Sequence, residues 1–247
     1  MTLFTAKTTE GSHLKVLAEL LKNVHQDICL VINAQGIFIS ITDTNQKIFL
    51  NIKLLAENFD IYEFTDTEKL VIGVDSSNFY RMLKSIKKKS NVLLKIESRE
   101  SSKLTVVIGS SSVDLYTYFH QESLFLIDGD YDKPITISPS NYYNDMKEIC
   151  SINKTLSVRM RKYSVLIEGA TSNVYRKRVL FGEQDDLTDT VYIKEFESAQ
   201  FKRLIKIGNL GDKMRMYSGS DRLPLKIRVN VGMLGALELC IKSKDQL

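Results

Sequence analysis

Apolar and polar positions alternate over most of this 247-residue chain, in short runs that predict β-strands. Two of these runs, Ile28–Ile32 and Ile37–Ile41, flank the turn-type segment Asn33-Ala34-Gln35-Gly36 and predict a β-hairpin. The remaining predicted strands include Val92–Ile96, Leu104–Ile108, Leu156–Met160, Ser164–Ile167, Lys226–Val229 and Ala236–Ile241. The chain is therefore predicted to be rich in antiparallel sheet.

Four stretches break this alternation and show the spacing of amphipathic helices. They are Gly11–Val24, Ser76–Lys88, Pro139–Ile152 and Phe196–Ile207. Three of them share a stripe of Ser, an aromatic residue, Leu or Met, and Ile, which recurs as Ser77-Tyr80-Leu83-Ile86, Ser140-Tyr143-Met146-Ile149 and Ser198-Phe201-Leu204-Ile207. The stripe predicts packing against a sheet, and each serine is the predicted N-cap. Strands with few helices indicate an α+β fold.

The order of helices and strands repeats along the chain, which predicts two similar domains. The predicted boundaries are 1–117 and 134–247, joined by a connector over 118–133. The connector carries an apolar run, Leu124–Ile127, followed by the acidic segment Asp128–Asp132. A connection of this length is typical of a functional surface segment, and an edge strand followed by a turn is the alternative.

Composition bounds the class of protein. Hydrophobic residues make up 43% and charged residues 26%, as in a globular protein. No apolar run approaches the ~20 residues of a membrane helix, and the start lacks the layout of a signal peptide. Cys29, Cys150 and Cys240 lie far apart, as expected for reduced intracellular thiols. No catalytic, metal-ligating or phosphate-cradling motif is present, so we expect neither enzyme activity, a metal nor a cofactor.

The net charge is only +4, so the positions of the cations carry more information than their number. Cations concentrate on the predicted helices at spacings of three, four or seven residues, and comprise Lys15, Lys22, Arg81, Lys84, Lys88, Lys147, Lys202 and Lys206. The third helix is the poorest, because Glu148 follows Lys147. Such faces suit sequence-independent contacts to DNA phosphates, whereas a solvated helix face is the simpler alternative.

The sequence resembles the proliferating cell nuclear antigen family of DNA sliding clamps along almost its whole length. The opening helix carries a Gly-Ser-x-Leu-Lys start, and three later segments match the family's Phe-Asp-x-Tyr, Val-Pro-Leu and Met-Gly-x-Leu motifs. The opening match is Gly11–Lys15, and the three later segments are Phe59–Tyr62, Leu223–Leu225 and Met233–Leu237. Thr42–Gln46 stands where the family has Met-Asp-Ser-Ser-His. The shared order and spacing carry the resemblance.

The resemblance implies the DNA-clamp fold, with two clamp domains per subunit and a closed homotrimeric ring. Helices would line the hole, and continuous antiparallel sheets would lie outside. Lys15, Lys22, Arg81, Lys84 and Lys206 fall on family positions that face the hole. The implied partners are double-stranded DNA, bound without sequence preference, a DNA polymerase with other clamp-binding peptides, and a clamp loader. The implied function is that of a polymerase processivity factor.

The resemblance also implies where partners and neighbouring subunits bind. A partner peptide would dock as a helical turn with aromatic anchors, in a pocket lined by Thr42, Gln46, Phe49, Phe125, Ile127, Pro224 and Cys240. Ordinary core packing is the alternative for Phe49 and Pro224. Subunits would join through the edge strands Val113–Phe119 and Val174–Phe181.

Two departures from the family pattern point to a divergent, viral member. Ile241-Lys242-Ser243-Lys244 replaces the family's Leu-Ala-Pro-Lys, and the chain is slightly basic whereas cellular members are acidic. The expected location is the nucleus, or a cytoplasmic replication site for a viral protein. Two alternatives stay open. One is a monomeric clamp-fold processivity or transcription factor, and the other is an all-β enzyme with an unrecognised site.

Overall fold

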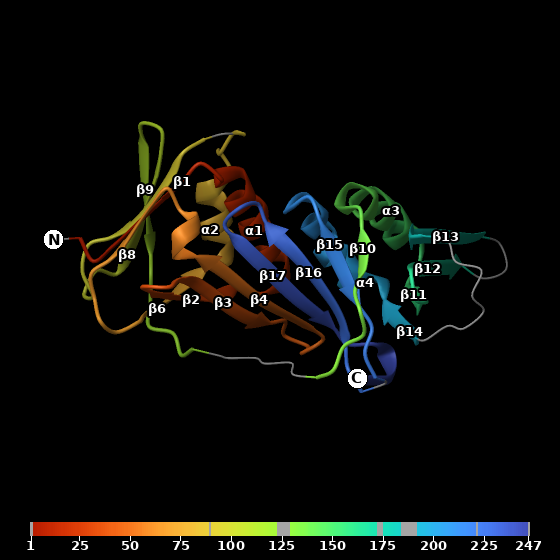
Figure 1. The fold of residues 1–247 in the computed structure, drawn as a ribbon. Helices are drawn as coiled ribbons and strands as arrows, with labels where there is room; N and C mark the ends of the chain where they lie inside the picture. Colours follow the sequence, from red (N-terminus) through yellow and green to blue (C-terminus); the bar gives the residue numbers. More distant parts are fainter. Residues whose placement is uncertain are drawn as a thin grey trace. The chain divides into compact units, whose positions relative to one another are not determined.

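A computed structural model describes residues 2–88, 90–122, 129–171, 175–183, 192–220 and 222–246, with the side chain of Thr171 left out. The chain divides into two compact units (Figure 1). Unit 1 consists of Met1–Ile41, Leu50–Phe125 and Asn230–Leu237, and unit 2 consists of Thr42–Phe49, Leu126–Val229 and Glu238–Leu247. The predicted boundaries at residues 117 and 134 stay a prediction.

Unit 1 packs the helices α1 (Gly11–Val24) and α2 (Ser76–Leu83) against two layers of strands. One sheet has the order β5-β1-β7-β8-β9, and in the other layer β4, β3, β2 and β6 are successive neighbours. The strands are β1 Phe4–Thr8, β2 Asp27–Asn33, β3 Gly36–Thr42, β4 Ile48–Leu55, β5 Ile61–Phe64, β6 Leu70–Asp75, β7 Val92–Ile96, β8 Lys103–Ile108 and β9 Ser111–Tyr116. A short 3₁₀ helix, η1, covers Ala56–Asn58.

Unit 2 has the helices α3 (Pro139–Ile152) and α4 (Ser198–Leu204), the latter continued by the 3₁₀ helix η2 (Ile205–Asn209). Its strand orders are β13-β12-β11-β14 and β10-β15-β16-β17. The strands are β10 Ile135–Ile137, β11 Thr155–Met160, β12 Ser164–Thr171, β13 Tyr175–Gly182, β14 Tyr192–Glu197, β15 Met214–Tyr217, β16 Leu225–Val231 and β17 Gly235–Ile241. The end of β16 and the start of β17 fall within Asn230–Leu237, which is counted with unit 1. The 3₁₀ helix η3 covers Lys244–Gln246.

The two units follow one topology, which confirms the predicted internal repeat and the α+β class. Each begins with a strand and a helix, continues with a run of strands, and then has a second helix and three more strands. The pairing repeats as well, because β6-β2-β3-β4 corresponds to β14-β11-β12-β13 and β1-β7-β8-β9 corresponds to β10-β15-β16-β17. Only β5 has no counterpart among the described strands.

The predicted hairpins form with antiparallel registers. In β2 and β3, Ile32 pairs with Ile37 across the turn, and Gly36 at φ 148° approaches the carbonyl of Leu54 too closely for any side chain. The pairs β7 with β8 and β11 with β12 are also antiparallel, as predicted. Alternate residues of β7 and β11 are buried, as in strands with one face toward the core, whereas five consecutive residues of β2 are buried.

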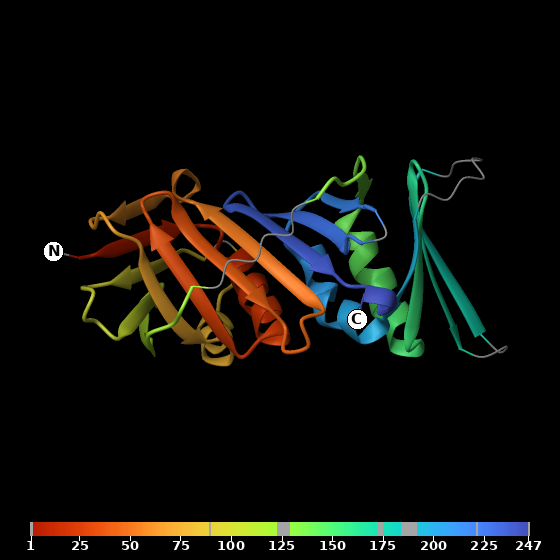
Figure 2. The same cartoon turned by 90° about the horizontal axis from the view of Figure 1, so that it is seen from below.

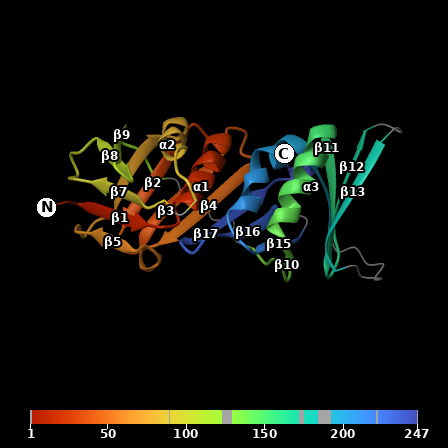
Figure 3. The same ribbon diagram turned by 90° about the horizontal axis from the view of Figure 1, so that it is seen from above.

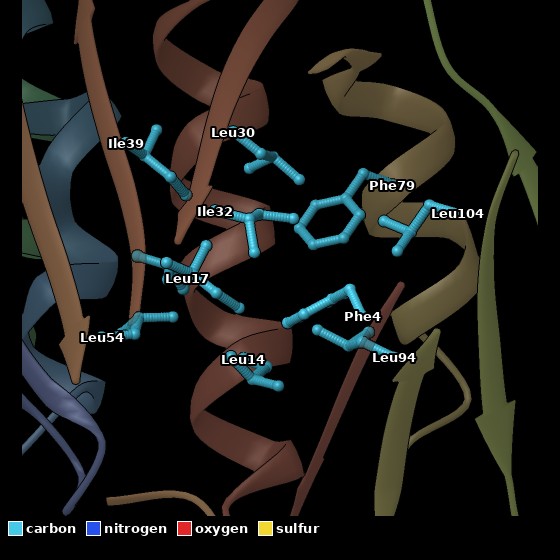
Figure 4. A pocket seen from close by; sticks show the side chains of 11 residues that line it. Phe4, Leu14, Leu17, Leu30, Ile32, Ile39, Leu54, Phe79, Leu94 and Leu104 are labelled. Carbon is cyan, nitrogen blue, oxygen red and sulfur yellow. The ribbon is translucent and has the colours of Figure 1, made fainter. Parts of the chain in front are cut away.

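The core of unit 1 lies between its helices and its strands (Figure 4). Leu14 and Leu17 of α1 and Phe79 of α2 point toward Phe4, Ile32 and Leu54 of the strands (Figure 4). They enclose a cavity of about 20 Å³, lined only by apolar side chains. Figure 2, the view from below, shows the strands β2, β3 and β4 in front of the helices of unit 1.

Two helices are shorter than predicted. The helix predicted over Ser76–Lys88 ends at Leu83, because the chain tightens into turns in which Ile86 N donates to Leu83 O (3.1 Å) and Lys87 N donates to Ser90 Oγ (3.1 Å). Lys88, predicted to be a helix residue, therefore lies beyond the helix. The helix predicted over Phe196–Ile207 begins only at Ser198, since Phe196 belongs to β14.

The predicted serine N-caps are wrong. Ser77, Ser140 and Ser198 lie inside their helices, and the caps are the residues Asp75, Ser138 and Glu197. Asp75 accepts from the backbone N of Asn78 at 2.7 Å, and Glu197 forms a capping box with Gln200. A carboxylate can accept a hydrogen bond from an unpaired helix amide as well as a hydroxyl can. Several neighbouring polar residues could therefore serve as the N-cap, and the first residue of each helix was ambiguous from the sequence.

Candidate nucleic-acid interface and partner-binding surface

The first group of cations lies on the two helices of unit 1, which pack side by side (Figure 3), and on the segment that follows α2. Four of the five predicted residues are exposed, namely Lys22, Arg81, Lys84 and Lys88. Lys15 is half-buried, and its Nζ donates to the carbonyl of Ile86 at 3.1 Å, which ties α1 to the segment that follows α2. Lys84 is the C-cap of α2, where a cation complements the helix dipole.

The second group lies on the helices of unit 2. Lys147 of α3 and Lys202 of α4 are exposed, and Lys206 of η2 is half-buried. The positive charge of α3 is diluted, because Glu148 follows Lys147 and forms an ion pair with Lys177 of β13. That this helix contributes the weakest cationic surface of the four stays a prediction.

Two of the cations lie over tyrosine rings. Lys22 Nζ is 5.2 Å from the ring centroid of Tyr80, and Lys206 Nζ is 5.8 Å from that of Tyr143. At these distances the ring quadrupole attracts the ammonium group. Each pair joins the two helical segments of its own unit, so the rings restrict where the lysines point. The sequence pattern predicts both tyrosines only as members of the packing stripe.

The loop that contains Thr42 and Gln46 is built around the buried Asp43. Its Oδ1 accepts from the backbone N of Lys47 at 2.7 Å and of Ile48 at 2.8 Å. Gln46, at φ 55°, is in the left-handed region, and its N donates to Asp43 O at 2.9 Å. Thr42 Oγ1 donates to Ile48 O at 3.1 Å. The loop therefore has one defined conformation, with the side chain of Gln46 exposed.

Tyr131, which is not among the predicted pocket residues, interacts with two residues that are, Pro224 and Cys240. Its hydroxyl donates to the carbonyl of Pro224 at 3.2 Å, and its side chain interacts with Cys240, whose pKa burial raises to about 11. Lys226 Nζ lies 5.1 Å from the ring centroid of Tyr131. Sequence reasoning missed Tyr131 and Lys226, although Tyr131 belongs to the acidic part of the predicted connector.

The remaining pocket residues divide into described and undescribed ones. Phe49 is half-buried, and Lys242 Nζ lies 5.4 Å from its ring centroid, so the start of β4 contacts the segment after β17. Lys242 N also donates to Lys47 O at 2.9 Å. Pro224 is buried. Phe125 and Ile127 lie outside the described residues, and their place in a pocket stays a prediction.

The strands predicted to join subunits lie at the ends of their sheets. Within the described strands, β9 pairs with β8 and β13 pairs with β12, and each is the last strand in its sheet order. Val113 of β9 is 45% exposed and Leu180 of β13 is 47% exposed. Val174, the predicted start of the second edge strand, lies outside the described residues. The unpaired backbone groups of an edge strand can pair with a strand of another chain.

The described residues contain no group of three or more His, Cys, Asp or Glu side chains arranged to hold a metal ion. Among the helices within the described ranges, none has the length and apolar composition needed to cross a membrane. Burial raises the pKa of all three thiols, to about 12 for Cys150 and about 11 for Cys240. Thiols of this kind stay protonated and are poor nucleophiles.

Two repeats of one helix-and-strand topology define the class of this protein as an α+β clamp fold. A crystal structure of proliferating cellular nuclear antigen from Entamoeba histolytica has this fold, with a TM-score of 0.86 over 99% of this chain and 100% of that chain at 17% identity. Residues 3–133 match the family model of the proliferating cell nuclear antigen, N-terminal domain. The chain belongs to the proliferating cell nuclear antigen family.

Similar curated proteins occur in a virus and in an archaeon. The chain is 22% identical over 254 aligned positions to a probable DNA polymerase sliding clamp of Paramecium bursaria Chlorella virus 1, covering 97% of this chain and 96% of that protein. It is 23% identical to a DNA polymerase sliding clamp of Methanococcus vannielii, covering 91% of this chain and 92% of that protein. These lengths agree, so the likeness extends over whole chains.

Proposed function

We propose that this protein is a DNA sliding clamp, a processivity factor that encircles duplex DNA as a homotrimer and tethers a DNA polymerase. The observation that carries the proposal is the set of cations on the helices of both units, within the fold of this family. Their contacts would be to phosphates, which every sequence shares, so the ring would hold DNA without stopping at any site.

The proposed ring forms through β9 of one subunit and β13 of the next. Closure would cover both exposed edges and bury Val113 and Leu180. Repeating each cationic helix around the duplex would let individually weak phosphate contacts add up. In this proposal the protein carries out no chemistry itself. Its location is the site of DNA replication, where a clamp loader would open the ring.

Partners would bind at the surface formed by the loop Thr42–Phe49, Pro224, Tyr131 and the C-terminal end of β17. Thr42, Gln46, Phe49, Pro224 and Cys240 would line it, with Phe125 and Ile127 completing it. Support comes from Tyr131, which contacts both Pro224 and Cys240, and from Lys242, which contacts both Phe49 and Lys47. A short helical turn with aromatic anchors fits such an apolar surface beside polar groups.

Light scattering of the purified protein tests the proposed assembly. The subunit mass is 28.2 kDa. A closed trimer should give roughly 85 kDa, without dependence on concentration near the working range. A monomer that stays monomeric at every concentration would contradict the ring and favour a monomeric clamp-fold DNA-binding protein.

A further inference from the structure

Helix α4 contacts the loop Thr42–Phe49, called the partner loop below. It does so through a face that is distinct from the one that carries Lys202. Glu197, Gln200 and Arg203 are three residues apart and so lie along one side of the helix. Glu197 pairs with Lys47 Nζ at 2.9 Å, and Gln200 Nε2 donates to Lys242 O at 3.1 Å. The first turns of α4 are thereby bonded to the loop Thr42–Phe49 and to the segment after β17.

The most buried of these contacts joins Arg203 to Asp43. Arg203 Nη1 donates to Asp43 Oδ2 at 2.8 Å, and the side chain of Asp43 is 1% exposed. A buried carboxylate is costly unless it is paired and fully hydrogen-bonded. Here one oxygen accepts from Arg203, while the other accepts the two backbone amides of Lys47 and Ile48. Arg203 therefore neutralises the group around which the loop is folded.

The neighbouring lysine has a different environment. Lys202 is one residue before Arg203, about 100° around the helix, and it is exposed. Arg203 is only 31% exposed and is engaged with Asp43. Two adjacent cations on α4 thus face in different directions, one toward solvent and one toward the partner loop.

We propose that Asp43 and Arg203 are positioning residues for partner binding, so that α4 holds the loop in the conformation that presents Thr42, Gln46 and Phe49 to a partner peptide. This inference rests on the proposed partner surface. It separates the cations of α4 by role, with Lys202 directed to DNA and Arg203 directed to the loop. It also places partner recognition under the control of a helix whose other face is proposed to meet DNA.

The test compares Arg203→Met, Arg203→Lys and the matched neighbour Lys202→Met in the full-length protein. The probe is a fluorescein-labelled synthetic peptide that forms one helical turn followed by two aromatic residues, and anisotropy measures its Kd. Arg203→Met loses a charged hydrogen bond that orders the loop, so the Kd of the peptide should rise by about tenfold or more. Arg203→Lys should restore part of the affinity, because an ammonium keeps the charge but lacks the planar fork.

A second measurement follows the loop directly. Hydrogen exchange of the Lys47 and Ile48 amides should accelerate by about tenfold or more in Arg203→Met, while the amides of β11 and β12 keep their protection. Lys202→Met should leave peptide affinity and loop exchange within about twofold of the wild type and should lower the salt slope of DNA binding.

Three results would overturn the inference. One is an Arg203→Met protein that binds the peptide as the wild type does. Another is a salt slope of DNA binding that falls as much in Arg203→Met as in Lys202→Met, which would make Arg203 a phosphate contact. The third is faster exchange throughout unit 2, which would make the pair a general structural bond. A wild-type protein that binds no peptide would instead contradict the proposed partner surface, a failure visible before any variant is compared.

Discussion

Replacing Lys84 by Ala should weaken DNA binding through the loss of phosphate contacts alone. Lys84 is exposed at the C-cap of α2, three residues after the exposed Arg81. The matched control is Lys53→Ala. Lys53 is an exposed lysine of β4, and its neighbour Leu54 points into the core beneath α1, so Lys53 points to the opposite side of the sheet. Both variants lose one positive charge per subunit.

The expected magnitude follows from counterion release. Each lost phosphate contact lowers the slope of log K against log salt by about 0.9. A homotrimer carries three copies of the substitution, so the slope should fall by about 0.9 if one copy contacts DNA and by about 2.7 if all three do. With a slope difference of about 2.7, a fourfold rise in salt concentration changes the ratio of the wild-type to the Lys84→Ala binding constant by roughly fortyfold. Folding should change by less than about 0.5 kcal/mol.

Fluorescence anisotropy of a labelled duplex, titrated at several salt concentrations, measures these slopes. Lys84→Ala should lower the slope equally on duplexes of unrelated sequence, because no base edge is read. Lys53→Ala should keep the wild-type slope. If Lys53→Ala lowered the slope as much as Lys84→Ala, net charge alone would govern binding, and the assignment of the helices to DNA would be wrong.

Three further predictions concern the partner surface, the ring and the thiols. Phe125→Ala combined with Ile127→Ala should abolish stimulation of the polymerase while the trimer mass is kept; dissociation with stimulation intact would place both residues in the core or the subunit interface. Leu180→Asp, which puts a charge on an exposed edge strand, should reduce the mass from roughly 85 kDa toward the 28.2 kDa subunit, and an unchanged mass would exclude β13 from the interface. Cys150 and Cys240, with pKa values raised by burial to about 12 and about 11, should resist iodoacetamide at pH 8 until the chain unfolds; rapid labelling of the folded protein would contradict their burial.

The raised pKa values also set the sign of a pH effect on stability. A thiol whose pKa is higher in the folded state than its ordinary value of 9.0 favours folding fully below pH 9. Its contribution is lost as the pH rises from about 9 toward 11 or 12. The folded state should therefore lose stability in this alkaline window through Cys150 and Cys240.

Periodicity predicted the elements well where one face of a helix is buried throughout. The bounds of α1 and α3 agree with the predicted Gly11–Val24 and Pro139–Ile152. The ends of α2 and α4 did not follow from periodicity, because Ile86 and Ile207 continue the apolar spacing while the backbone has already tightened into turns or a 3₁₀ helix. Apolar spacing reports which side chains are buried, and several backbone paths bury the same set.

The candidate site was predictable only where it depends on local spacing. Exposed cations such as Arg81 and Lys84 follow from helical periodicity, since neighbours on one face share its exposure. The pairing of Asp43 with Arg203 joins residues that are 160 positions apart, and no local pattern distinguishes Arg203 from Lys202. Tyr131 was missed for the same reason, because its contacts with Pro224 and Cys240 arise only from the tertiary fold.

Retention on circular and linear DNA tests encirclement most directly. The protein is loaded onto a nicked circular duplex with its clamp loader, free protein is removed, and the DNA is then either left closed or cut once by a restriction enzyme. A ring that is topologically linked to DNA should stay on the circle and slide off the cut molecule quickly, even when weak phosphate contacts are removed by Lys84→Ala. If the protein leaves the circular and the cut DNA at the same rate, contacts rather than encirclement hold it, and the sliding-clamp account is contradicted.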